Sequence, residues 1–321
     1  MKVLVTGSSG WLGRYLMPML RTAGHCPIGL DIMPGEHTDI VGTVADIAII
    51  EKAFTEHSIE AVIHAAALHK PDIARHGEKE FVDVNIAGTL NLLTIAAAAG
   101  HDRFVFTSTT SLMISEAVRA ERGVAAVWLD ETSGPLAPRN IYGVTKLAAE
   151  GLCRLYARER NLPCVILRTA RFFPEEDDTL TELSGPNLKA NEFLHRRLTV
   201  EDAAAAHIAA LERAPDVGFD ISIVSAPTPF DRSDCEALKS NAEDVVARYF
   251  PDAPILYERE GWKLPTSIAR VYDARHAETT LGFRCRTSFA DILEALRAEL
   301  PMPFAHRPDY VSPMVAAGMS D

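Results

Sequence analysis

The stretch Thr6-Gly7-Ser8-Ser9-Gly10-Trp11-Leu12-Gly13 decides the fold. It joins a short apolar run, Lys2 to Thr6, to a segment with helical periodicity over 11–23. The glycine spacing allows a positive φ at the turn, close approach of a pyrophosphate and tight packing of the helix on the strand. The helix start offers unpaired N–H groups to an anion. We therefore predict a dinucleotide site whose loop contacts are Gly7, Ser9, Gly10, Trp11, Leu12 and Gly13.

Two acidic residues extend this prediction to the adenosine half of the cofactor. Asp31 ends a second apolar run, 26–31, where a carboxylate accepts hydrogen bonds from ribose hydroxyls and repels a 2′-phosphate. The predicted cofactor is therefore NAD rather than NADP. Asp46 follows the apolar Val44-Ala45, and with Ile47 it is predicted to contact the adenine. Asp46 is equally suited to cap the helix that follows, and the two roles are compatible.

Strand-like and helix-like segments alternate along the first half of the chain. Further apolar runs predict strands at 61–64, 103–108, 164–168 and 221–224, and helices at 79–99, 141–160, 200–213, 231–248 and 288–299. Pro18 is expected to kink the first helix. The alternation predicts an α/β fold, a Rossmann-type doubly wound parallel sheet with a smaller C-terminal substrate lobe. We assign 1–171, rejoined by 199–224, to the NAD-binding domain, and 172–198 and 225–321 to the lobe.

Composition narrows the classes of partner and the compartment. The chain has 321 residues, 47% of them hydrophobic, and a net charge of -12, which disfavours nucleic acid and anionic lipid as partners. Five cysteines without metal or redox spacing suggest reduced thiols and a cytoplasmic location. No apolar run long enough to span a membrane is recognised, and no His cluster predicts a metal.

The segment Tyr142-Gly143-Val144-Thr145-Lys146 carries the predicted chemistry. Its i, i+4 spacing places Tyr142 and Lys146 on one helix face. A phenol with a pKa near about 10 is a poor base at neutral pH, and a neighbouring ammonium lowers that pKa. The ammonium can also hold the nicotinamide ribose. Tyr142 could then take a proton from a substrate hydroxyl as a hydride leaves the same carbon.

These motifs together resemble the extended short-chain dehydrogenase/reductase family, typified by UDP-glucose 4-epimerase. The matching pieces run in family order over about two thirds of the chain. They are TGSSGWLG at 6–13, Asp31, VADI at 44–47, HAAALH at 64–69, VNIAGTLNLL at 84–93, FVFTSTTS at 104–111, DETSGPLAPRNIYGVTK at 130–146, LRTARFFP at 167–174 and LTVEDAAAAH at 198–207.

The resemblance implies a role for individual residues. Thr109 takes the position of the catalytic hydroxyl, with Tyr142 as acid/base and Lys146 as its helper. A homodimer is implied through the helices 79–99 and 141–160. Asn85 is expected to brace the central strands, and the stretch from Arg168 to Phe173 to close over the nicotinamide. The cofactor residues implied beyond the glycine loop are His64, Ala65, Ala66, Asn85, Thr107, Tyr142, Lys146, Arg168 and Arg171.

Two departures from the family pattern restrict the reaction and the substrate. Thr110 and Ser111 follow Thr109 where dehydratases and decarboxylases carry an acid, which argues against those reactions. Only residues 174–197 separate Phe173 from Leu198, a shorter span than nucleotide-sugar enzymes have. A smaller polyol, sugar acid or aldehyde is therefore an alternative substrate. The substrate candidates are His69, Thr109, Thr110, Arg171, Phe172 and Arg270.

The sequence thus predicts an NAD-dependent sugar epimerase that oxidises a secondary hydroxyl transiently, on a sugar or nucleotide sugar. An NAD-dependent dehydrogenase or reductase of a sugar, sugar acid or other small hydroxy compound is the alternative, because both use the same Thr, Tyr and Lys. A non-catalytic NAD-binding regulator is the third hypothesis. It is disfavoured because the chain keeps both Tyr142 and Lys146.

Overall fold

A seven-stranded parallel sheet forms the centre of the computed structural model, which describes residues 1–176 and 182–317. The strand order is β3-β2-β1-β4-β5-β7-β8, and each neighbouring pair is parallel. The fold class predicted from the sequence is therefore confirmed. The strands are β1 (Lys2–Thr6), β2 (Cys26–Asp31), β3 (Ile40–Val41), β4 (Ala61–His64), β5 (Phe104–Thr109), β7 (Cys164–Thr169) and β8 (Phe219–Val224).

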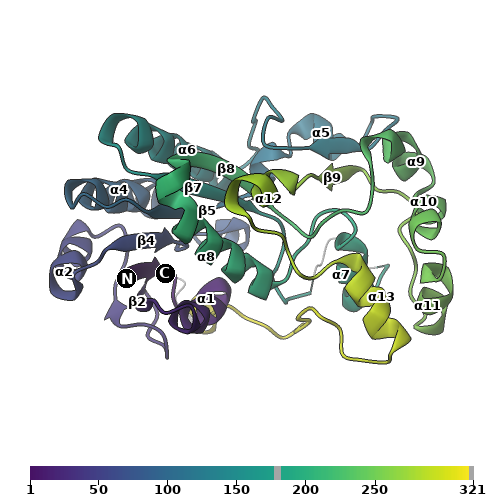
Figure 1. The fold of residues 1–321 in the computed structure, drawn as a ribbon, viewed down its shortest axis with the longest axis horizontal. Coiled ribbons are helices and arrows are strands. Elements are labelled where there is room, and N and C mark those ends of the chain that lie inside the picture. Colours follow the sequence, from purple (N-terminus) through teal and green to yellow (C-terminus); the bar gives the residue numbers. More distant parts are fainter. Residues whose placement is uncertain (177–181, 318–321) are drawn as a thin grey trace.

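Helices cover both faces of this sheet (Figure 1). Because side chains alternate along a strand, Val105 and Val165 join the core under α1 (Trp11–Thr22) and α8 (Val200–Val217). Phe104 and Ile166 join the opposite core under α2 (Ile47–His57), α4 (Gly88–Ala98) and α6 (Ile141–Arg160). This alternation decides which polar side chains of β5 and β7 face α6.

Three of the predicted helices differ in detail. α1 continues through Pro18, which lies on the exposed face where the carbonyl that lost its partner can be solvated. The expected kink stays a prediction. The segment 79–99 divides into α3 (Glu78–Phe81), the π-helical η2 (Val82–Ala87) and α4. The segment 231–248 breaks at Asn241 into α9 (Cys235–Ser240) and α10 (Ala242–Tyr249), after the 3-10 turn η4 (Arg232–Asp234).

A second group of helices lies beside the sheet (Figure 1). Its side chains form a separate hydrophobic core. It contains Phe193, Tyr257 and Phe289, and β6 (Val127–Leu129) pairs with β9 (Arg270–Tyr272) next to it. Two segments pack on the other side of the predicted domain boundary. β6 comes from the segment assigned to the NAD domain but pairs with β9 of the lobe, and α12 comes from the segment assigned to the lobe but packs on β8 of the sheet. The remaining elements are η1 (Lys70–Ala74), η3 (Thr110–Met113), α5 (Glu116–Ala120), α7 (Gly185–Glu192), α11 (Ala253–Arg259), α12 (Arg275–Leu281), α13 (Phe289–Arg297) and α14 (Pro313–Ala316).

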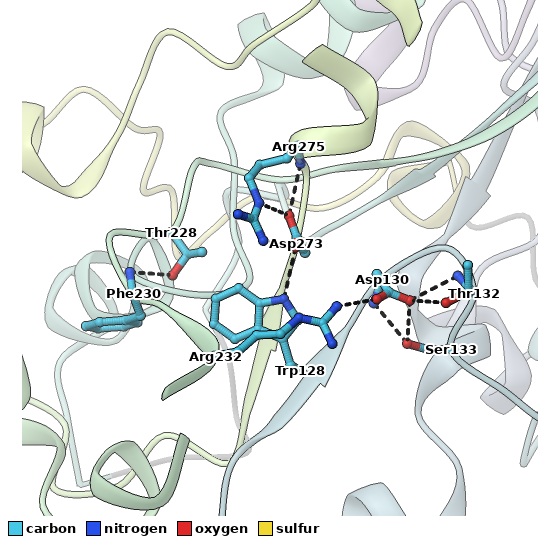
Figure 2. A network of polar contacts seen from close by, with 9 residues as sticks. All are labelled: Trp128, Asp130, Thr132, Ser133, Thr228, Phe230, Arg232, Asp273 and Arg275. Atoms are coloured by element: carbon cyan, nitrogen blue, oxygen red, sulfur yellow. Dashed lines mark hydrogen bonds and ion pairs between the residues drawn. The ribbon is translucent and has the colours of Figure 1, made fainter. Parts of the chain in front are cut away.

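A polar network joins β6 and the loop that follows it to residues 228–232 and 273–275 (Figure 2). The Trp128 indole donates to Asp273, 3.0 Å away, and Arg275 holds the same carboxylate through two nitrogens. Arg232 lies over the Trp128 ring and pairs with Asp130. The hydrogen bonds from Arg275 lower the pKa of Asp273 to about 2, so this carboxylate is charged at neutral pH.

The expectation that no stretch is apolar enough to cross a membrane needs correction. Helical residues Glu78–Ala98 are long and apolar enough by length and composition alone. In this structure α4 packs against α2, α6 and β4, and Leu92 and Leu93 are fully buried in the core of the sheet. A core helix of this kind passes the same test as a membrane span.

The tight glycine turn generates a prediction about stability. A Cβ at Gly13 would lie 2.3 Å from the carbonyl oxygen of Gly7, which is backbone and cannot rotate away. We expect Gly13→Ala to lower the free energy of unfolding by about 1 to 3 kcal/mol and to weaken NAD binding. Urea unfolding and calorimetric titration with NAD measure the two effects.

Gly123→Ala is the matched control, because a Cβ there meets no atom closer than 3.5 Å. Its unfolding free energy should be unchanged or slightly higher. Equal effects of the two substitutions would contradict the tight contact at Gly13.

Candidate active site

The glycine loop has the shape that a dinucleotide phosphate requires. Gly7 has a φ of 77°, and a Cβ there would come within 2.9 Å of the backbone nitrogen of Ala66. The first turn of α1, Trp11 to Arg14, carries no acidic side chain that would compete with an anion. The backbone of Ala65 and Ala66 lies against this turn, since Thr6 accepts from both amides. The loop therefore fits a pyrophosphate at the N-terminus of α1.

Asp31 is oriented by the same loop. Its carboxylate accepts from the backbone N–H of Ser9 at 2.9 Å and of Met33 at 2.8 Å. Burial raises its pKa, while the two backbone hydrogen bonds act in the opposite direction. A carboxylate has about four acceptor positions, so two remain for ribose hydroxyls. The Ser9 N–H, in contrast, is already occupied, so a contact from Ser9 to the cofactor would need another group.

The other adenine-side residues have visible structural roles. Asp46 caps α2 by accepting from the amide of Ala48 at 3.0 Å, and Ile47 is half exposed beside it. The Trp11 indole donates to the carbonyl of Phe172, which ties the loop after β7 to the glycine turn. Leu12 is buried in the core beneath. Cofactor contacts by these residues stay predictions.

Thr109, Tyr142 and Lys146 come together at the carboxyl ends of the central strands. Thr109 ends β5, while Tyr142 and Lys146 lie one turn apart in the first turns of α6. Asn140 caps this helix by accepting from the amide of Gly143, which sets the position of Tyr142. The Lys146 ammonium lies 4.1 Å from the centre of the Phe106 ring. All three predicted catalytic side chains are buried.

The protonation states differ from the expectation that Lys146 lowers the pKa of Tyr142. Burial raises the pKa of Tyr142 to about 12, and the Thr109 side chain and not Lys146 is the group that opposes the rise. Burial also lowers the pKa of Lys146 to about 7, with Cys153 and Glu150 acting to raise it. Desolvation therefore outweighs the attraction between phenolate and ammonium, and Tyr142 rests as a neutral phenol.

Several predicted site residues instead hold the surrounding elements together. His64 is fully buried, with its two ring nitrogens 2.7 Å from Thr6 Oγ1 and 3.0 Å from Thr89 Oγ1. Burial lowers the pKa of His64 to about 3, so it is neutral. Thr107 lies 2.7 Å from a ring nitrogen of His207 on α8. A cofactor contact from His64 or Thr107 would therefore have to come from the main chain.

Asn85 and Thr110 are also engaged within the protein. The Asn85 amide bonds to both backbone groups of Leu68 and to Thr145 on α6, so it braces the loop after β4 against that helix rather than the strands themselves. The Thr110 hydroxyl donates to the carbonyl of Thr169 and is buried. A substrate role for the Thr110 side chain is therefore not supported.

Arg168 is the clearest correction among the predicted cofactor contacts. Its side chain points to the α6 face of β7 and is buried. Its Nε and Nη2 pair with the two oxygens of Glu150, at 3.0 and 2.8 Å. Alternation along the strand turns the Arg168 side chain to the face of β7 that α6 covers. The guanidinium therefore joins β7 to α6 and does not close over the nicotinamide.

Aromatic rings connect Tyr142 to the loop after β7. The His69 ring lies 5.6 Å from the Tyr142 ring and 5.7 Å from the Phe173 ring, and Phe173 stacks on Phe172. Burial and the Lys146 charge lower the pKa of His69 to about 4, so the imidazole is neutral. Of the predicted substrate residues, His69 and Thr109 therefore both lie beside the phenol.

Sequence reasoning missed a buried carboxylate that gathers arginines next to these rings. Glu192, at the end of α7, pairs with Arg171 at 3.2 Å, Arg196 at 2.9 Å and Arg197 at 2.8 Å. The three guanidinium groups lower the pKa of Glu192 to about 2 although burial acts to raise it. Arg197 also donates to the carbonyl of Phe173. We call Glu192, Arg171, Arg196 and Arg197 the arginine cluster. Arg171 was a predicted site residue, and the adjacent Arg196 and Arg197 were the other visible signal in the sequence.

Arg270, a predicted substrate residue, lies near this cluster. It begins β9, and its carbonyl accepts from His195. Its charge lowers the pKa of Arg196, although burial is the larger cause. Its guanidinium lies 4.0 Å from the Glu121 carboxylate. Four guanidinium groups therefore gather in this region, with Glu192 and Glu121 as ion-pair partners, and Glu175 lies close enough to Arg171 and Arg197 for their charges to affect its pKa.

In residues 1–176 and 182–317, no group of three or more His, Cys, Asp or Glu side chains is arranged to hold a metal ion. The prediction that the enzyme uses no metal stays a prediction.

A phosphate loop, an acid at the end of β2 and a buried Thr, Tyr and Lys define the class: a nicotinamide-dependent enzyme on a Rossmann fold. The model of the NAD-dependent epimerase/dehydratase family matches residues 3–185, more than half of the chain. The chain belongs to this family, and its cofactor is NAD.

Two curated relatives illustrate its position in the family. UDP-glucose 4-epimerase of Rhizobium meliloti is 32% identical over 174 residues, which cover 52% of this chain and 50% of that protein. The chain thus matches about half the length of this relative. L-arabinose 1-dehydrogenase (NAD(P)(+)) of Haloferax volcanii is 27% identical over 308 residues, 91% of this chain and 99% of that protein.

Solved structures agree on the fold. A short-chain dehydrogenase/reductase superfamily protein from Agrobacterium tumefaciens with bound NAD has a TM-score of 0.64 at 23% identity, over 93% of this chain and 98% of that one. UDP-glucose 4-epimerase from Thermotoga maritima, solved with UDP-glucose, has a TM-score of 0.64 at 22% identity, over 94% and 100%.

Burial of Lys146 generates a prediction about pH. Its pKa is about 7 in the folded protein against an ordinary value of 10.5. Between these values the unfolded chain binds one more proton, so the free energy of unfolding rises with pH. We expect Lys146→Met to flatten this rise, measured by urea unfolding from about pH 7 to 10.5. Parallel curves for the two proteins would contradict the buried lysine.

Proposed function

We propose that this enzyme oxidises a secondary hydroxyl of a sugar, with Tyr142 as the acid/base. The observation that carries the proposal is the buried group of Thr109, Tyr142 and Lys146 at the strand ends beside the glycine turn. A phenol, an ammonium and a hydroxyl grouped around one point suit proton transfer to and from an alcohol oxygen. A regulator that only binds NAD would have no use for this group.

Each side chain has a task in this reaction. NAD, when bound, supplies the hydride acceptor. Thr109 donates a hydrogen bond to the substrate oxygen as its charge changes, and Tyr142 exchanges a proton with that oxygen. The neutral phenol is the form that protonates a carbonyl oxygen. In the other direction the Lys146 charge must stabilise the phenolate against burial, which raises the pKa of Tyr142 to about 12.

Epimerisation is the first form of this proposal, and it returns the hydride to the opposite face of the same carbon. Its support is the family and the UDP-glucose 4-epimerase relatives. A net dehydrogenase is the second form. Its support is the sugar dehydrogenase relative, which matches nearly its whole length, and the short span of residues 174–197 between β7 and the segment leading to α8.

The arginine cluster favours a substrate with an acidic group. Arg197 contacts the carbonyl of Phe173, and Phe173 contacts His69 beside Tyr142, so the cluster adjoins the reacting position. Arg171 is its most exposed member, with 46% of its side chain accessible. Guanidinium groups bind carboxylate and phosphate through paired hydrogen bonds. A sugar acid or a sugar phosphate, including a nucleotide sugar, satisfies this chemistry.

A homodimer in the cytoplasm completes the proposal. Exposed apolar side chains lie along the helices 79–99 and 141–160 that the sequence suggested as the interface. They are Val82, Leu90, Val144 and Leu155. Apolar side chains on one face of paired helices favour association in water.

The role of Tyr142 is tested by removing one oxygen. We expect Tyr142→Phe to lower kcat by about 10²- to 10⁴-fold, because proton transfer loses its group, with little change in NAD binding. Tyr156→Phe is the matched control on the same helix, since its hydroxyl contacts Thr94 in an exposed position. Equal turnover in Tyr142→Phe and the wild type would refute the proposal.

The two forms of the reaction differ in what happens to the reduced cofactor. Purified enzyme incubated with NAD and a panel of sugars, sugar acids and sugar phosphates is followed by absorbance in the NADH band. NADH that accumulates in step with product indicates a dehydrogenase. Conversion of a sugar to its epimer, with cofactor bound and no net NADH, indicates an epimerase. No conversion of any compound by NAD-loaded enzyme favours the regulator.

The acidic substrate group generates its own prediction. Arg171→Met should raise KM about 10-fold or more for an acidic sugar and change kcat less, because one charged hydrogen-bond donor is lost. For a neutral sugar of the same ring configuration the two enzymes should not differ. Arg158→Met, which removes an exposed guanidinium paired with Glu159 on α6, is the control. An equal loss with acidic and neutral sugars contradicts the assignment.

A further inference from the structure

Glu150 is a buried carboxylate on the helix that carries Tyr142 and Lys146. Only 4% of its surface is exposed. The Ser108 hydroxyl donates to its Oε1 at 2.6 Å, and Arg168 donates to Oε1 at 3.0 Å and Oε2 at 2.8 Å. These bonds hold the carboxylate in one orientation.

The position of Glu150 relative to Lys146 follows from helix geometry. Residues 142, 146 and 150 are spaced i, i+4 and i+8 along α6, so their side chains share one face. Ser108 and Arg168 reach that face because both occupy strand positions that point to α6. Phenol, ammonium and carboxylate therefore follow one another along the same stripe of buried helix.

We propose that Glu150 is a positioning residue that keeps Lys146 charged beside Tyr142, and that Arg168 and Ser108 fix Glu150 for this task. The proposal rests on the function proposed above. Its consequence is that the catalytic group extends one helical turn into the core, beyond any atom that touches substrate or cofactor.

Cys153 and Glu150 are the two groups that act to raise the pKa of Lys146, and Glu150 is the one that is a carboxylate. His64 and His69 are neutral, because burial lowers their pKa values to about 3 and 4. The Phe106 ring presents its π-electrons 4.1 Å away. Burial raises the pKa of the Cys153 thiol well above its ordinary value, so that thiol is neutral.

Two carboxylates complete the surroundings. Asp72, on η1, acts on the pKa values of His69 and Tyr142. Glu150, on α6, acts to raise the pKa of Lys146, which burial lowers to about 7. At neutral pH a small change in this balance decides whether Lys146 carries its proton.

A purely structural role for the ion pair between Glu150 and Arg168 makes a different prediction. A buried ion pair between a strand and a helix is often no more stable than a well-packed apolar pair, so cohesion alone does not require it. If the pair only held β7 to α6, removing either charge would act in the same way. If Glu150 sets the charge of Lys146, removing the negative and the positive member must have opposite effects.

The experiment titrates Lys146 directly. Protein labelled with 13Cε-lysine and free of substrate is followed by NMR across pH 5 to 10, and the Lys146 resonance is the one missing from Lys146→Arg. We expect Glu150→Gln to lower its titration midpoint by about one pH unit, and Arg168→Met to raise it. Glu159→Gln, an exposed carboxylate on the same helix, should leave it unchanged.

A second readout is the alkaline limb of kcat/KM, which should move in the same directions once a substrate is known. If a single variant does not fold, the double variant Glu150→Gln/Arg168→Met removes both charges, and its midpoint should fall between those expected for the singles. Midpoints that move together, or that do not move in folded variants, overturn the inference. Because the titration needs no substrate, it can succeed even if the proposed reaction fails, and Tyr142→Phe tests that reaction separately.

Discussion

The backbone of the first turn of α1 lies so close to Gly7 and Ser8 that position 13 has no room for a side chain. A Cβ on Gly13 would meet backbone oxygens at 2.3 and 2.5 Å. This contact places the helix N-terminus directly above the end of β1, where its free N–H groups are suited to bind a phosphate. Asp31 is drawn to the same point by the amide of Ser9. The chemistry proposed for the other site residues requires a dinucleotide at this turn.

The period of two along β5 and β7 divides the polar groups of the site into two sets. One set, Ser108 and Arg168, points to α6, and both side chains donate hydrogen bonds to Glu150. Thr107 points to α8 and His207, while Thr109 lies at the strand end beside Tyr142. The last residues of the strands thus form the site, and the neighbouring strand residues hold α6 and α8 in place through hydrogen bonds.

Burial decides the charges of the site more than any pair interaction does. Tyr142 and Lys146 both have pKa values shifted toward their neutral forms. Glu192 is the exception, because three guanidinium groups overcome its burial. The site therefore combines a phenol and an ammonium whose pKa values are shifted toward their neutral forms with a carboxylate whose pKa three guanidinium groups hold low.

Local pattern alone predicted the parallel sheet, the glycine loop, Asp31 and the Tyr142–Lys146 pair. These features depend on short-range spacing: alternation in strands, glycines in a turn, and i, i+4 in a helix. The lobe helices over 231–259 were predicted less well, because their break at Asn241 and the unforeseen α11 leave little periodic signal.

Tertiary structure decided the rest. It turned Arg168 toward Glu150, His64 toward Thr6 and Thr89, and gathered Arg171, Arg196 and Arg197 around Glu192. It also made Tyr142 a phenol, since a pKa depends on desolvation that no spacing reveals. Sequence determines which groups neighbour one another along a strand or helix. Only packing decides which distant charges meet and how much water remains around them.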